Sequence, residues 1–176
     1  ADAADTTAPY TAMQGTAFVV DFNPVADRLR VISDSGQSLR INVDTGATTT
    51  DGNINRAGVA PLVAAAAYTN SIPNAASTQL FDVDAASSVL ALQNPPNDGT
   101  LVNVGPLGVT VAGDGGMDIG GGANGLVLAA LRTTAGGPSS LYRVNVSTGA
   151  ATPVNGATTP ATAATRRPRA GPRWCT

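Results

Sequence analysis

One eight-residue stretch occurs twice and decides the fold: Arg40-Ile41-Asn42-Val43-Asp44-Thr45-Gly46-Ala47 returns as Arg143-Val144-Asn145-Val146-Ser147-Thr148-Gly149-Ala150, with six of eight positions identical. Before the turn, apolar residues alternate with polar ones, which is the pattern of a strand with one buried face. The Asp-Thr-Gly-Ala that follows supplies an Asx-type turn in which Gly46 is free to adopt positive φ. The repeat therefore predicts β-hairpins of one kind at two places in the chain.

A weaker copy lies between these two, at Leu80-Phe81-Asp82-Val83-Asp84-Ala85-Ala86-Ser87. If Asp44, Asp84 and Ser147 are equivalent, the copies lie 40 and 63 residues apart. A period of about 40–45 residues is typical of a four-stranded propeller blade. The longer interval would then contain an insertion, which we place around residues 93–113.

Strand-like segments around the first copy complete one such blade, at residues 18–22, 27–33, 39–43 and 48–50. A second blade is predicted from residue 62 to residue 104. In it, the alanines at 64–67 form a strand close to the propeller axis, although they could also start a helix. A third blade follows from residue 117 to residue 154. We expect an all-β, β-propeller-like domain of about three four-stranded blades at residues 1–157, partial or completed by oligomerisation, and a Pro/Arg-rich C-terminal tail at residues 158–176.

The composition excludes several classes of function. The 176 residues include 10 basic side chains, all arginine, and 12 acidic ones, all aspartate, so the net charge is −2. Without His and Lys the chain lacks the usual general base, the commonest metal ligand and the Schiff-base amine. Its single cysteine forms no internal disulfide or zinc site, and no apolar run reaches the 18 residues of a membrane span. We expect no transition-metal site, no membrane span and no nucleic-acid partner.

Several segments resemble a known family: Val20-Asp21-Phe22-Asn23-Pro24, Asp27-Arg28-Leu29-Arg30-Val31, Ser33-Asp34-Ser35-Gly36-Gln37, Asp44-Thr45-Gly46, Ala65-Ala66-Ala67-Tyr68-Thr69-Asn70 and Asn94-Pro95-Pro96-Asn97-Asp98-Gly99-Thr100-Leu101. Over residues 15–156 the chain is similar to the secreted bacterial family called domain of unknown function number 4394. The last of these segments is quite specific. The resemblance implies a propeller-like repeat fold and an exported protein. It implies no established activity and no catalytic residues.

Two aspartates are candidate catalytic residues. Asp21 and Asp118 occupy similar positions in the predicted innermost strands of their blades. Two carboxylates that converge on a propeller channel could act as acid and as nucleophile or base in glycoside hydrolysis. The alternative is that each carboxylate binds neighbouring backbone.

The Pro-stiffened loop around Asn97 and Asp98 is a candidate metal site, because both side chains could offer oxygens to Ca²⁺. The alternative is that they cap the backbone of their own loop. If the protein binds an ion we expect Ca²⁺, and we expect no other cofactor. The Gly-rich run at residues 113–122 lacks the lysine and the following helix of a phosphate loop.

The C-terminal tail carries the candidate partner-binding residues. Its arginines could bind an acidic surface and its tryptophan could fill a pocket on a partner. These residues are Arg166, Arg167, Arg169, Arg173 and Trp174. The alternative is a disordered basic tail, or a reading-frame accident at the end of the gene.

We expect a non-enzymatic extracellular protein that self-associates or binds a surface partner. The small residues at the start of the chain are common in secreted or periplasmic proteins after signal cleavage. The alternatives are a secreted hydrolase, for a glycoside or lactone, that uses the channel aspartates, and a glycan- or small-ligand-binding module. Propellers close their rings with four to eight blades, and open strand edges pair with other chains. Three blades therefore predict a homo-oligomer or a filament.

Overall fold

The structure is a computed structural model that describes residues 1–154, and it consists of three antiparallel sheets of four strands each. The first sheet holds β1 (Phe18–Asn23), β2 (Arg28–Ser33), β3 (Ser38–Ile41) and β4 (Thr48–Thr50). The second holds β5 (Val63–Tyr68), β6 (Leu80–Asp84), β7 (Val89–Gln93) and β8 (Leu101–Pro106), with a short 3₁₀ helix, η1 (Pro96–Asp98), before β8. The third holds β9 (Gly116–Ile119), β10 (Val127–Arg132), β11 (Ser139–Val144) and β12 (Ala151–Pro153).

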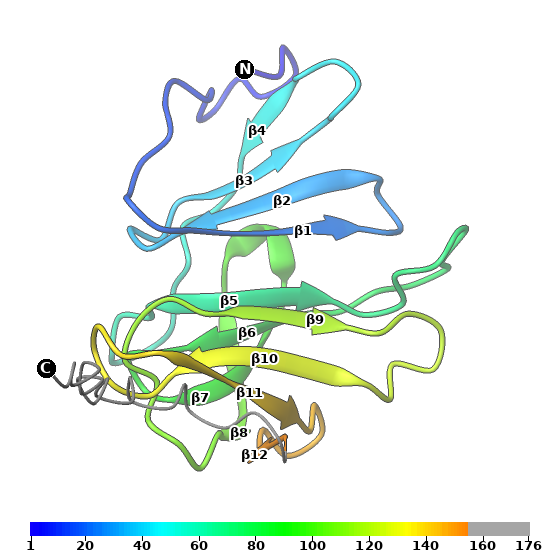
Figure 1. Ribbon diagram of the computed structural model, residues 1–176. Helices are drawn as coiled ribbons and strands as arrows, with labels where there is room; N and C mark the ends of the chain where they lie inside the picture. Colours follow the sequence, from blue (N-terminus) through cyan, green and yellow to red (C-terminus); the bar gives the residue numbers. More distant parts are fainter. Residues whose placement is uncertain (155–176) are drawn as a thin grey trace, which may run out of the picture.

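The three sheets are arranged as consecutive blades. In each sheet the strands are neighbours in chain order, and the first strands, β1, β5 and β9, lie together at the centre, with β5 in contact with both of the others (Figure 1). The second sheet therefore lies between the first and the third. The prediction of an all-β, propeller-like fold is confirmed, and the three sheets do not close into a ring. Within residues 1–154 no helix is long and apolar enough to span a bilayer.

The two strong copies of the repeat form the hairpins β3–β4 and β11–β12, as predicted. Gly46 and Gly149 adopt φ values of 72° and 83° in these turns. The side chains that close the turns are those of Asn42 and Asn145, whose Oδ1 atoms accept backbone N–H groups two and three residues later. The turn therefore begins at Asn42, two residues before Asp44, where we expected it to start.

The weak copy at residues 80–87 is not equivalent to the other two. It forms β6 and the turn to β7, a second-to-third strand connection, whereas the strong copies connect third to fourth strands. Many hairpins have alternating apolar residues followed by a turn that contains aspartate. The similarity therefore did not determine which hairpin of the blade residues 80–87 form. Residues 93–113, predicted to hold an insertion, instead include η1 and the outer strand β8.

The alanines at residues 64–67 lie in the inner strand β5, where all six residues of the strand are buried. Their small side chains let β5 pack against β1 on one side and β9 on the other. The alternative of a helix at this position was wrong.

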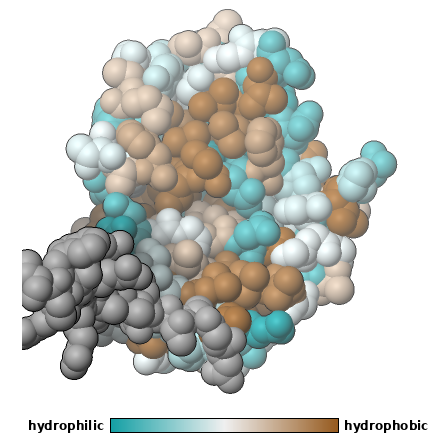
Figure 2. Space-filling view, in the orientation of Figure 1, coloured by the Kyte–Doolittle hydropathy of each residue, from teal (hydrophilic) through white to brown (hydrophobic). Residues whose placement is uncertain are grey.

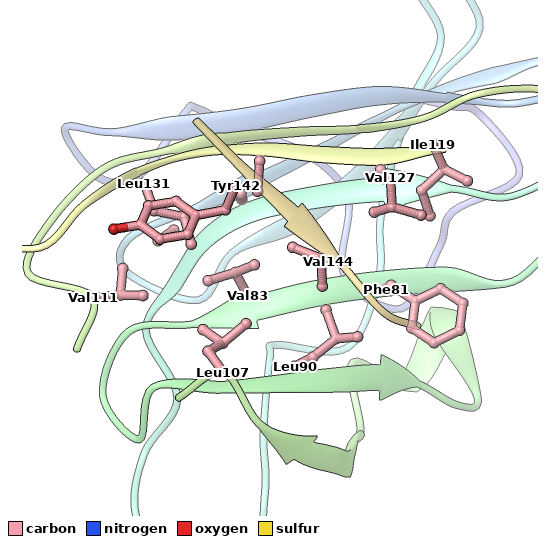
Figure 3. Close-up of a cluster of buried hydrophobic side chains, with 14 residues drawn as sticks. Phe81, Val83, Leu90, Leu107, Val111, Ile119, Val127, Leu131, Tyr142 and Val144 are labelled. Carbon is pink, nitrogen blue, oxygen red and sulfur yellow. The ribbon is translucent and has the colours of Figure 1, made fainter. Parts of the chain in front are cut away.

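Two hydrophobic clusters join the sheets. The larger one fills the space between the second and third sheets, with Phe81, Val83 and Leu90 facing Leu131 and Tyr142 (Figure 3). The smaller one lies between the first and second sheets around residues Ile32, Tyr68 and Leu80. The junction between the first and second sheets is therefore less apolar, and it contains the polar residues described below.

Candidate functional site

The two candidate catalytic residues line one cavity at one end of the inner strands. Asp21 in β1 and Asp118 in β9 both border this hollow of about 640 Å³, together with Phe22, Asp27 and residues 71–75 of the β5–β6 loop. Among the described residues, three carboxylates and no basic side chain line it, so the cavity is acidic. Asp21 and Asp118 thus border the same cavity, and their catalytic role stays a prediction.

Asp21 uses both carboxylate oxygens for backbone. Its Oδ2 accepts the N–H of Tyr68 in β5 at 2.6 Å, and its Oδ1 accepts the N–H of Phe22 at 2.8 Å. Burial raises the pKa of Asp21, the two N–H groups act in the opposite direction, and the nearby charge of Asp118 adds to the rise. Asp21 thus joins the first sheet to the second, which is the alternative that we stated for the two aspartates.

Asp118 lies on the side of β9 that faces away from the second sheet. Its neighbours in the same strand, Met117 and Ile119, pack into the cluster between the second and third sheets, while Asp118 is exposed. Within residues 1–154 its carboxylate accepts no hydrogen bond. The two aspartates therefore differ in environment, since one is held by backbone and the other faces solvent.

The predicted calcium loop is connected to the first sheet. The Oδ1 atom of Asn97 accepts a hydrogen bond from Nη2 of Arg30 at 2.8 Å, and the backbone oxygen of Asn97 accepts the N–H of Gly52. Asp98 is exposed, and its backbone oxygen accepts the side-chain N–H of Asn55. A guanidinium occupies the Asn97 oxygen that we expected to be available for Ca²⁺. Within residues 1–154 no three acidic, His or Cys side chains gather into a metal-binding group.

A buried arginine connects the first and second sheets. The guanidinium of Arg30 donates to Tyr68 Oη at 3.2 Å, Ser38 Oγ at 2.9 Å, Asp51 Oδ2 at 2.5 Å and Asn97 Oδ1 at 2.8 Å. Its side chain is only 2% exposed. Charge-assisted hydrogen bonds of this kind are about twice as strong as neutral ones. One residue of β2 therefore holds β3, β5 and the loop of η1 in place.

Asp82 is the most unusual residue of this junction. It is fully buried in β6, and neither of its carboxylate oxygens has a hydrogen-bond partner among residues 1–154. Its neighbours across the sheet are Ala66 and Ala91, which offer no side-chain donor. Burial raises the pKa of Asp82 to about 8, against the effect of the Arg30 charge, and Asp84 adds to the rise. Asp82 is therefore a neutral carboxylic acid at pH values below its pKa.

Sequence reasoning missed the roles of Arg30 and Asp82. A usable signal was present, since Arg28 and Arg30, and Asp82 and Asp84, repeat a charge at alternate positions of a predicted strand. Such spacing places both charges on one face of the sheet. It does not say whether that face meets solvent or another sheet.

The remaining predicted residues fall into two groups. Arg40 and Arg143 begin the two copies of the repeat, but their surroundings differ. Arg40 forms an ion pair with Asp51 at 2.7 Å, whereas Arg143 is exposed on β11. A hollow of about 420 Å³ lies beside Arg143. Outside the described residues lie the domain boundary at 157 and the predicted partner-binding residues Arg166, Arg167, Arg169, Arg173 and Trp174.

Comparison with known proteins identifies a family. Residues 1–164 match the family model described as Domain of unknown function (DUF4394). Among curated proteins no match was found. The match includes every residue of the three sheets and of the cavity.

Proposed function

Because the chain belongs to the family Domain of unknown function (DUF4394), whose description states no activity, we propose a function from the geometry of its sheets. We propose that the protein is non-enzymatic and self-associates, and that two copies complete one six-bladed propeller. We also propose that it acts outside the cytoplasm, which is supported by the sequence features alone.

The observation that carries this proposal is an apolar strip on the inner strand of the first sheet. Phe18, Val20 and Phe22 alternate along β1 on the side away from the second sheet, and they are 41%, 58% and 48% exposed. A large hydrophobic patch over this sheet is visible in Figure 2, and a second one lies over β10 and β11 of the third sheet. Exposed apolar groups on a central strand indicate a surface that another structure covers.

The direction of the blades favours a second copy of the chain as the partner in this proposal. The face of the first sheet that carries Val19 and Ile32 packs on the second sheet, and the opposite face of the second sheet packs on the third. Within residues 1–154, no sheet packs on the open face of the first sheet and none packs on the open face of the third. A second copy supplies a sheet for both faces, because its third sheet can pack on the open face of the first sheet in the same way.

Closure explains why the assembly would stop at two copies. Six blades lie within the four to eight of closed propellers, and a closed ring protects the edges of β1, β5 and β9. With a two-fold axis along the channel, both junctions are identical. Each should bury well over about 1,000 Å² in total.

The molar mass in solution tests the proposal. We expect light scattering at micromolar concentration to give twice the 17.4 kDa of one chain. Val20→Asp places a charge in the proposed junction and should yield the monomer, because an unpaired buried charge is strongly unfavourable. Val102→Asp, at an exposed valine on β8 of the second sheet, is the matched control and should leave the dimer intact. A wild-type monomer with a cooperative melt would overturn the proposal, and a distribution of long filaments would overturn the closed ring.

The cavity at Asp21 and Asp118 supports a second candidate function, a binding site for a small polar ligand such as a glycan. Carboxylates next to an aromatic side chain, here Phe22, can bind sugar hydroxyl groups and one apolar sugar face. We expect neutral oligosaccharides, tested by isothermal titration, to bind wild type and to lose binding in Asp27→Asn. Absence of heat with every oligosaccharide would exclude this candidate.

A further inference from the structure

The contact that Asp21 makes between the first and second sheets depends on a free backbone N–H. Thr69 donates its N–H to the backbone oxygen of Gln79, the residue just before β6. Because N–H groups alternate in direction along a strand, the N–H of Tyr68 points away from β6, toward the centre. The side chain of Asp21 reaches this N–H from β1, at 2.6 Å. A carboxylate of one blade is thus bound to the inner-strand edge of the next.

Asp118 occupies the equivalent position of the third sheet. Across the first sheet the register runs Asp21, Arg30, Arg40, Thr49, and across the third sheet it runs Asp118, Leu128, Arg143, Thr152. The last two members of each row also match in the sequence repeat, because Arg40 and Arg143 begin the two copies. Register and sequence therefore give the same equivalence.

The inner edge of β1 offers a matching donor. The backbone oxygen of Ala17 accepts the N–H of Asp34, so the backbone groups of Ala17 point toward β2. Because these groups alternate in direction along a strand, the N–H groups of Phe18, Val20 and Phe22 point away from β2, toward the centre. Phe22 donates to Asp21 of its own chain. Val20 resembles Tyr68 in two respects. Its N–H points outward from the edge of an inner strand, and its side chain lies on the face of the sheet that would meet the preceding blade of the ring.

We infer that Asp118 connects one copy to the next by accepting the backbone N–H of Val20 in β1 of the second copy. The inference rests on the proposed function, since it needs the third sheet of one copy to meet the first sheet of another. The proposed hydrogen bond adds a specific acceptor to the apolar contact that the strip of β1 makes with the other copy. It also gives a role to Asp118, an exposed carboxylate on an inner strand. Apolar residues bring the sheets together, and Asp118 fixes their register.

The dimer dissociation constant of variants tests the role of Asp118. We expect Asp118→Ala to weaken the dimer roughly 100- to 10,000-fold, because each of the two identical junctions loses one hydrogen bond to a charged group. Asp118→Asn keeps an acceptor oxygen and should weaken the dimer less. Asp114→Ala removes the same charge from a nearby exposed loop position and is the control, with little change expected. Sedimentation velocity over a concentration series provides all four constants.

The equivalent intramolecular contact gives a second readout. Asp21→Ala should lower the melting temperature of each chain by several degrees, whereas Asp118→Ala, at an exposed position, should leave the melting temperature of the dissociated chain unchanged. A wild-type monomer would overturn the proposed function and this inference together. A wild-type dimer whose constant is the same in Asp118→Ala as in Asp114→Ala would overturn the inference alone. If Asp118→Ala does not fold, Asp118→Asn decides by the same comparison.

Discussion

Replacing Asp82 with asparagine should make the stability of the protein less dependent on pH and should raise it relative to wild type, by on the order of a few kcal/mol, as the pH increases from 4 to 8, because it removes a carboxyl group that resists ionisation where it is buried. In the folded chain the pKa of Asp82 is raised from 3.8 to about 8, mainly by burial. Asparagine has nearly the same shape and no charge. The variant therefore keeps the packing between Ala66 and Ala91 without the pH-dependent destabilisation.

The sign follows from proton binding. Between pH 4 and pH 8 the folded state keeps the proton on Asp82, while the unfolded state has released it. The contribution of Asp82 to stability is therefore fully present below pH 4, decreases as the pH rises, and is lost above pH 8. The stability difference between Asp82→Asn and wild type should accordingly be small near pH 4 and largest at pH 8 and above.

Urea unfolding of both proteins at several pH values between 5 and 8.5 measures this difference. Asp84→Asn is the matched control, two residues away on the same face of β6. Asp84 accepts hydrogen bonds from Arg56, Leu62 and Ala86, so its loss should destabilise the protein at every pH. If the stability difference between Asp82→Asn and wild type were the same at every pH, Asp82 would bind no extra proton in the folded state, and the interpretation would be wrong.

Replacing Arg30 with methionine should destabilise the protein by about 3–5 kcal/mol, the usual effect of removing one member of a buried ion pair. Methionine fills much of the same space but leaves Ser38, Asp51, Tyr68 and Asn97 without their common donor. Asp51 keeps its ion pair with Arg40, which limits the loss. Arg30→Lys should recover only part of it, because an ammonium group lacks the planar fork that reaches several acceptors.

The urea midpoint at pH 7 measures this effect, and Arg28→Ala is the control. Arg28 lies in the same strand and donates only to the backbone oxygens of Ala26 and Asp27, so its removal should change stability by less than about 1 kcal/mol. Equal losses in Arg30→Met and Arg28→Ala would show that the buried network contributes no more than a surface contact. Arg30→Met should also raise the pKa of Asp82 further, since the Arg30 charge lowers it.

The sequence by itself determined the hairpins. The alternating residues of β3 and β11, and the Asn and Gly of the turns that follow, act over a few residues and need no distant partner. The alanine run of β5 was predicted to be a strand close to the propeller axis, with a helix as the alternative, and it forms that inner strand. The approach of Asp21 and Asp118 to one space followed from their common place in first strands.

The tertiary structure alone decided which faces meet. The alternating pattern of a strand places Arg30, and likewise Asp82, on one face of its sheet. The residues that this face contacts belong to another sheet. Arg30, for example, donates to Tyr68, more than 30 residues away in the chain. For the same reason the weak repeat at residues 80–87 could not be assigned to its place in the blade, since every antiparallel hairpin has the same local pattern. Burial without a partner, which sets the pKa of Asp82, is a property of the packed sheets and not of the strand that contains it.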